Sequence, residues 1–120
     1  MNKPLHDFLM AKGIPYTKNL EPNIILLSIN DAEEFLRIAR DEQIAIIGAD
    51  VYEKISGTRY LIEKTFDLAW SCDCNDGEDI TFKSYYDRSI EMAKIGLCRV
   101  RDRMKNDNNQ LYINYVLPNN

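Results

Sequence analysis

The chain has 120 residues, 45% of them hydrophobic and 28% charged, which is the balance of an ordinary folded domain. Its 19 acidic residues outnumber its 15 lysines and arginines, and the net charge of −4 argues against nucleic acid as a ligand, because phosphate binding needs a basic surface. No apolar run approaches the roughly 20 residues of a membrane-spanning helix, and residues 1–10 contain no long apolar region. We therefore expect no secretion signal, and one cytoplasmic domain over residues 1–120 with no membrane partner.

The first predicted element is a helix over residues 4–12. Leu5, Phe8 and Leu9 share one face at helical spacing, which predicts that this face is buried. Gly13 stands where a glycine often ends a helix, and a connector follows it.

A continuous apolar run at residues 24–29 predicts the first strand. Its length and isoleucine content favour a strand that is buried on both faces. A helix follows, for which Asn30 is the expected N-cap and Glu33 its capping-box partner. This helix should end near Glu42. Four apolar residues mark its buried face: Ala32, Phe35, Leu36 and Ala39.

Residues 44–54 predict a second strand, in which Gly48 indicates a bulge or a close backbone approach. Ser56-Gly57 has the composition of a two-residue hairpin loop. That loop fixes a register and therefore an outward face. The outward face pairs Tyr52 with Leu61, Asp50 with Glu63, and Lys54 with Arg59.

This register gives the hairpin a second, apolar face that belongs to the core. The core face holds Ile47, Ala49, Val51, Tyr60 and Ile62. On the outward face two acids oppose each other and two bases oppose each other. Because like-charge pairs across strands destabilise a sheet, either the register differs or this face is not optimised for stability alone.

A long helix is predicted from Thr81, its N-cap, to Met104. Apolar residues recur at spacings of three and four: Phe82, Tyr86, Ile90, Ala93, Leu97, Val100 and Met104. Such a helix is about 36 Å long, whereas the strands should span roughly 20 Å, so one of its ends overhangs the sheet. A last strand is predicted at residues 110–117, where apolar residues alternate with polar ones.

These elements predict an α+β fold with an N-terminal helix followed by the order βαββαβ. The sheet should have four strands in a mixed or antiparallel arrangement, with the helices packed on one face. A ferredoxin-like arrangement is the simplest topology with this order.

Three cysteines and one histidine are the only soft metal ligands of the chain. Cys72 and Cys74 form one Cys-x-Cys pair without the second cluster of a structural zinc site. His6 should be exposed on the first helix, and Cys98 should be a small core residue of the long helix. We therefore expect that the thiols are reduced, that no metal or cofactor is bound, and that the protein is not an enzyme. The alternative is a small metal- or thiol-dependent enzyme or regulator that uses Cys72, Cys74 and nearby carboxylates.

Residues 66–82 carry five acids and no lysine or arginine, next to aromatic residues. This acidic segment is either a solvated loop or a surface that binds a basic protein. Tyr52 on the outward hairpin face and Tyr85 beside the apolar stripe are interface candidates, since tyrosine and tryptophan are enriched at binding hot spots. Trp70 fits either an interface or the core.

Several segments resemble one known family. Residues 48–52 (Gly-Ala-Asp-Val-Tyr) resemble its Gly-Gly-Asp-Val-Tyr segment, and residues 65–73 resemble its Thr-Tyr-Asp-Asn-Trp-x-Cys-Asp segment, with two residues in place of the Asn. Residues 86–93 resemble the start of its last helix, and residues 9–14 resemble its N-terminal helix and turn. This is the immunity protein 40 family of bacterial polymorphic toxin and contact-dependent inhibition systems.

The resemblance implies a protein that binds and neutralises a cognate toxin domain encoded beside it, by stoichiometric complex formation. The chain itself is expected to be a monomer or a weak homodimer. Its acidity makes a nuclease a candidate toxin, because nucleases tend to be basic. The acids and aromatic residues together suggest the toxin-binding residues Asp50, Tyr52, Asp67, Trp70, Asp73, Asp76, Glu78, Asp79 and Tyr85.

The triple substitution Asp76→Lys, Glu78→Lys and Asp79→Lys tests the acidic segment. We expect it to weaken toxin binding, because it replaces attraction for a basic partner with repulsion, while the melting temperature stays nearly unchanged. Calorimetric titration with the toxin domain and thermal unfolding measure the two effects. Unchanged affinity would remove these acids from the interface.

Overall fold

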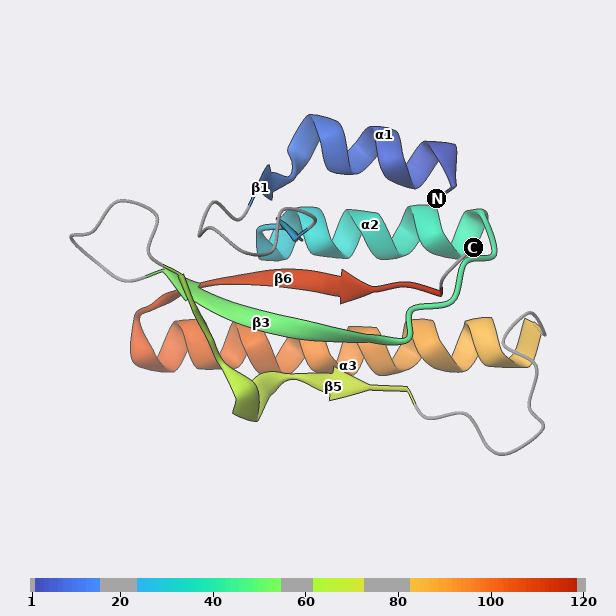
Figure 1. Ribbon diagram of the computed structural model, residues 1–120. Coiled ribbons are helices and arrows are strands. Elements are labelled where there is room, and N and C mark those ends of the chain that lie inside the picture. The colour runs from blue at the N-terminus through green and yellow to red at the C-terminus, as the bar shows by residue number, and fades with distance from the viewer. Residues whose placement is uncertain (1, 16–23, 55–61, 73–82, 119–120) are drawn as a thin grey trace.

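The computed structural model describes residues 2–15, 24–54, 62–72 and 83–118, and Figure 1 shows their arrangement. Its elements in chain order are α1 (Lys3–Lys12), β1 (Ile14–Pro15), β2 (Ile25–Leu26), α2 (Ile29–Asp41), β3 (Gly48–Lys54), β4 (Ile62–Lys64), the 3₁₀ helix η1 (Phe66–Leu68), β5 (Trp70–Ser71), α3 (Lys83–Asp107) and β6 (Gln110–Val116). The predicted α+β class is confirmed.

Strand β3 is the centre of the main sheet. It pairs antiparallel with β6 over its whole length, from Gly48 opposite Val116 to Lys54 opposite Gln110. Its other edge is shared by two short strands, with β5 beside its first two residues and β4 beside its last three. On the far side of β6, Leu27 forms a single antiparallel bridge with Ile113. The sheet is therefore organised as β6, then β3, then β4 and β5 in line.

The predicted ferredoxin-like order is wrong. In a ferredoxin-like sheet the second strand of the βαββαβ order lies at an edge and pairs only with the third, whereas β3, the second predicted strand, is central and pairs with β6 on one side and with β4 and β5 on the other. The predicted strand at residues 24–29 is reduced to β2 and the bridge at Leu27, because α2 already begins at Ile29. The two residues of β2 pair with β1 in a separate small sheet.

The predicted hairpin register is also wrong. Tyr52 lies opposite Lys64 and not Leu61, which is a shift of three residues, and Asp50 lies opposite Asn114 of β6. Hairpin register depends on the length of the connecting loop, which the composition of the sequence alone does not fix. The proposed Ser56-Gly57 turn and the predicted positions of Arg59, Tyr60 and Leu61 lie outside the described residues.

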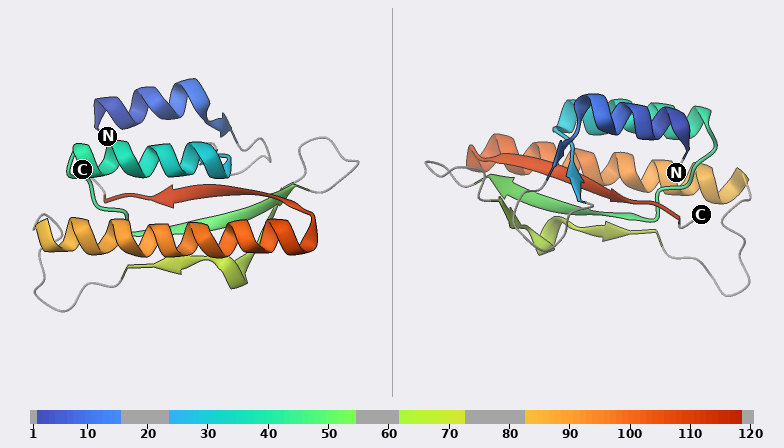
Figure 2. Two further views of the ribbon diagram at one scale, coloured as in Figure 1. Left: turned by 180° about the vertical axis from the view of Figure 1, so that it is seen from behind. Right: turned by 45° about the horizontal axis from the view of Figure 1, so that its top comes forward.

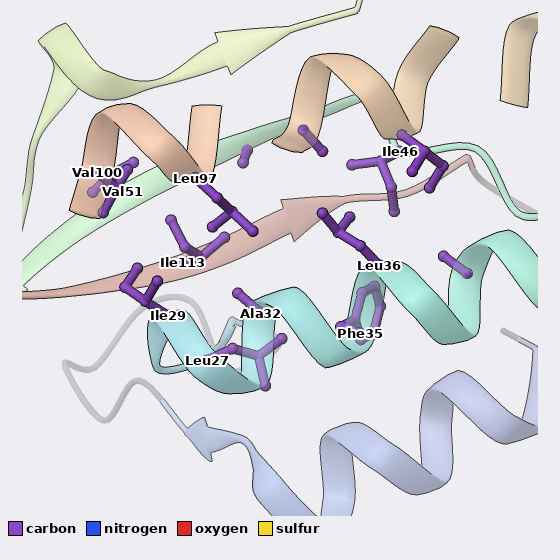
Figure 3. Close-up of a cluster of buried hydrophobic side chains, with 14 of the residues drawn as sticks. Leu27, Ile29, Ala32, Phe35, Leu36, Ile46, Val51, Leu97, Val100 and Ile113 are labelled. Atoms are coloured by element: carbon purple, nitrogen blue, oxygen red, sulfur yellow. The ribbon is translucent and has the colours of Figure 1, made fainter. Parts of the chain in front are cut away.

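The core lies between the sheet and the helices α2 and α3, which cover the same face (Figure 2). Figure 3 shows Leu36 of α2, Leu97 of α3 and Ile113 of β6 pointing into this core. Full burial of a large apolar side chain contributes roughly 1.5–3 kcal/mol to the free energy of unfolding, so this shared layer supplies much of the stability. The predicted buried face of the second helix is confirmed at Ala32, Phe35, Leu36 and Ala39.

The stripe on α3 is confirmed at Ile90, Ala93, Leu97 and Val100, which are all buried. Its predicted end at Met104 is close to the observed end at Asp107, and the predicted N-cap Thr81 lies outside the described residues. The N-terminal end of α3 extends past the end of β6, as the predicted overhang requires (Figures 1 and 2).

Helix α1 packs on α2, as its apolar face predicted. Leu5 is fully buried, and the rings of Phe8 and Phe35 lie 6.2 Å apart. Gly13 follows the helix in an extended conformation, where an added Cβ would lie 2.5 Å from the carbonyl oxygen of Leu9 and would also collide with Ile25. Gly13 therefore permits the close approach of β2 to the end of α1. None of the helices among the described residues combines the length and the apolar character that crossing a membrane requires.

Helix α2 is capped by Ser28 and not by Asn30 as predicted. The Ser28 hydroxyl accepts a hydrogen bond from the backbone N–H of Asp31 at 3.3 Å, while Asn30 lies exposed inside the first turn. Both residues are good N-caps, so the choice is set by the chain entering from Leu27, whose backbone is held against β6.

The matched substitutions Ser28→Ala and Asn30→Ala distinguish the two caps. Ser28→Ala should lower the free energy of unfolding by about 0.5–2 kcal/mol, because it leaves a backbone donor without its partner. Asn30→Ala should change it by no more than about 0.5 kcal/mol. Urea unfolding measures both, and a larger loss for Asn30→Ala would contradict the observed cap.

Candidate functional site

Among the residues that the structure describes, the predicted toxin-binding residues do not form one surface, because strand β3 divides them. Trp70 lies opposite Ala49 in the sheet, which places its side chain on the face that α2 and α3 cover. Asp50 and Tyr52 alternate with Ala49 and belong to the opposite face. Asp67 lies outside the sheet, in η1.

Tyr52 lies on the face of the sheet opposite the helices, as predicted, but it is buried there, so its predicted exposure is wrong. Only 4% of its surface is exposed, and it packs with Leu26 and with Tyr112, its partner in β6. The segment that contains β2 covers this face of the sheet, which the strand pattern alone does not reveal. Asp50, next to it, is half-buried opposite Asn114, whose amide donates to the backbone carbonyl of Ile25 at 3.1 Å.

Tyr85 is fully buried, so the prediction that it lies off the buried stripe is wrong as well. Its hydroxyl donates a hydrogen bond to the backbone carbonyl of Cys72 at 3.0 Å, and its ring packs with Ala45. The guanidinium of Arg88 lies 5.1 Å from the centre of that ring. Tyr85 thus ties the start of α3 to the end of β5.

Trp70 serves packing between β5 and α3. Gly96 of α3 faces its indole, and a Cβ at this position would lie 2.5–2.7 Å from three ring atoms. The Trp70 ring also meets the ring of Tyr115 edge-on at 6.5 Å. Of the two readings of Trp70, the structure favours the core, although the side chain keeps some exposure.

The 3₁₀ helix η1 presents two exposed side chains, Phe66 and Asp67. Phe66 is 75% exposed, which makes it the most exposed large apolar side chain among the described residues. Two anchors fix the turn beneath it: the N–H of Thr65 donates to the carbonyl of Val51 at 2.5 Å, and Leu68 is buried in the core. Phe66 was not predicted as a contact residue, since an apolar residue two positions from Leu68 gives no signal of exposure in the sequence.

Asp67 forms an ion pair with Arg103 of α3. The hydrogen bond from the guanidinium holds the pKa of the Asp67 carboxyl below its ordinary value, and the same contact raises the pKa of Arg103. Both side chains remain accessible to solvent. Exposed ion pairs of this kind contribute little to stability. Either side chain can therefore leave this pair and bind a group of a partner protein with little loss of stability.

The predicted residues Asp73, Asp76, Glu78 and Asp79 lie outside the described residues, as does Cys74. The backbone just before these residues is hydrogen-bonded, because the N–H of Cys72 donates to the carbonyl of Ile47 at 2.6 Å. The Cys72 thiol is buried, with 5% exposure. Within the part of the chain that the structure describes, no three His, Cys, Asp or Glu side chains are grouped so that they could hold a metal.

Substitution of Arg103 tests the electrostatics of η1. In the folded protein the pKa of Asp67 should lie below 3.8, and Arg103→Gln should return it to that ordinary value, whereas Lys105→Gln should have little effect. Because the folded pKa is lowered, the pair stabilises the fold above the ordinary pKa and loses this effect as the pH falls through the folded pKa. Carboxyl NMR titration measures the shift, and equal pKa values in wild type and Arg103→Gln would contradict the pair.

Comparisons with known proteins agree with the resemblance seen in the sequence. Searches among proteins of curated function and among solved structures gave no match. The family model described as immunity protein 40 matches residues 17–117, which include every element from β2 to β6, whereas α1 precedes the matched range. The likeness of residues 9–14 to that family stays a prediction. The match covers most of the chain, which therefore belongs to the immunity protein 40 family.

Proposed function

We propose that the protein binds a cognate bacterial toxin domain in a stoichiometric complex and so neutralises it, without catalysis. Membership of the immunity protein 40 family supports a protein partner of this kind. The structural observation that carries the proposal is the rigidly mounted, 75% exposed ring of Phe66 beside the exposed Asp67–Arg103 pair. The toxin would act, and be met, in the cytoplasm.

An exposed aromatic ring on a fixed turn suits a binding anchor. Burying such a ring against a partner removes a large apolar area from water, while the fixed backbone limits the entropy lost on binding. Hot spots of protein interfaces are typically such anchors surrounded by polar residues. Phe66 has Asp67 as its neighbour in the chain and Arg103 close by on α3.

We propose that the other acids of the acidic segment (residues 66–82) also contact the toxin. Asp67 stands before β5, and Asp73, Asp76, Glu78 and Asp79 follow β5 before α3 begins. Acids at an interface accelerate the capture of a basic partner and disfavour wrong partners. We therefore propose a basic toxin domain, and a nuclease is one class with that charge. Tyr52 and Tyr85 drop out of the proposed surface because they are buried.

Co-expression with the toxin domain encoded beside this gene tests the function. We expect a one-to-one complex in a pull-down and rescue of growth in cells that make the toxin. Absence of both binding and rescue would overturn the proposal.

Phe66→Ala tests the proposed anchor, with Met10→Ala as the matched control. Met10 is another exposed apolar side chain, 58% exposed on α1. Phe66→Ala should weaken toxin binding about tenfold or more and leave the melting temperature nearly unchanged, whereas Met10→Ala should change affinity by less than about twofold. Calorimetric titration measures both, and equal affinities for the two variants would exclude Phe66 as an anchor.

A further inference from the structure

A groove of about 370 Å³ runs between α2 and α3. The two helices lie side by side over the sheet, as the left view of Figure 2 shows. The floor of the groove is apolar, and it consists of Leu36, Ile90 and Leu97, each no more than 2% exposed. The remaining lining residues are Glu33, Arg37, Arg40, Lys94, Cys98 and Arg101. An apolar floor with a charged rim is the usual composition of a binding site.

The rim is held by ion pairs that cross from one helix to the other. Arg101 of α3 pairs with Glu33 of α2 at 2.5 Å, and Arg40 of α2 pairs with Glu91 of α3 at 3.0 Å. These pairs are exposed to solvent, with 41–61% of each side chain accessible. Because exposed ion pairs contribute little to stability, a partner can replace their acidic members without opening the helix pair.

Cations dominate the groove although the chain as a whole is acidic. Four of its nine lining residues are positively charged, and one, Glu33, is negatively charged. The acids that neutralise Arg37, Arg40 and Lys94 do not line the groove: these acids are Glu34, Asp41 and Glu91. The charges that face an occupant are therefore mainly positive, opposite in sign to the acidic segment after η1.

We propose that this groove is a second contact site for the toxin and that it takes an acidic segment of the toxin with an apolar side chain at its centre. The apolar side chain lies on Leu36 and Leu97, and the flanking carboxylates pair with Arg37, Lys94 and Arg101. This inference rests on the proposed function. It adds that the toxin presents an acidic segment here as well as a basic surface to η1.

Charge reversal on the rim tests the site. The double variant Arg37→Glu with Lys94→Glu changes the groove, and the matched control Lys3→Glu with Lys12→Glu makes the same charge change on exposed residues of α1 that do not line it. The groove variant should bind the purified toxin domain about tenfold or more weakly, whereas the control should stay within about threefold of wild type. Thermal unfolding of each variant verifies that it is folded.

Filling the groove gives a second test that leaves the rim charges in place. Cys98, which was wrongly predicted to be a core residue, is exposed and lines the groove, whereas Ile95 is 51% exposed on the same helix and does not line it. Cys98→Trp should weaken toxin binding about tenfold, and Ile95→Trp should leave it nearly unchanged.

The outcomes separate this inference from the proposed function. If wild type binds the toxin and the groove variants bind as tightly as their controls, the groove is not a contact site and the immunity function stands. Equal weakening by groove and control variants would mean a general charge effect and would also overturn the site. If wild type does not bind, both proposals fall.

Discussion

The fold depends on covering both faces of strand β3. Ala49 and Val51 on one face are 2% or less exposed beneath the helices, and Tyr52 on the other face is 4% exposed beside Leu26. A strand buried on both sides needs two separate covers. Helices α2 and α3 provide one of them. The other comes from the segment with β2, which the Leu27–Ile113 bridge holds at the edge of β6.

This constraint also explains which side chains remain available for function. Burial of Tyr52 and Tyr85 takes two expected contact residues into the interior, and Trp70 fills the space over Gly96. Among the described residues around β3, exposed side chains lie on the turn η1, at the outer edge of β3, and on the solvent-facing sides of α2 and α3. The two proposed surfaces lie there.

Periodicity predicted the parts of the fold that depend on one element at a time. The buried faces of α2 and α3 follow from spacings of three and four. The strand β6 was predicted as well, but its burial does not alternate as expected, because Leu111, Tyr112 and Ile113 are all buried. Strand order and register depend on loop length and on distant segments, which explains why the ferredoxin-like order and the pairing of Tyr52 with Leu61 were wrong. Tyr85 and Tyr86 are neighbours with similar patterns, and only packing against Cys72 decides which is buried.

Residues of the candidate surfaces could be predicted from the sequence only where a charged side chain is expected to be exposed. Asp67 is exposed as an acid is expected to be. Phe66 and the groove were missed because both depend on geometry between elements: Phe66 points outward only because Leu68 points inward, and the groove exists only where α2 meets α3.

Helix α3 connects the two proposed surfaces. Its seven lysines and arginines outnumber its four acids, whereas the chain carries a net charge of −4. Gly96 and Arg103 face β5 and η1, and Lys94 and Arg101 face α2, so the surfaces lie on opposite sides of one helix (Figure 1). A helix with its side chains is roughly 10–12 Å across, and an interface of ordinary size buries about 800 Å² on each partner. One toxin domain that straddles α3 can therefore reach both surfaces. The opposite charges of those surfaces would fix its orientation, since a toxin turned by half a revolution would place like charges together.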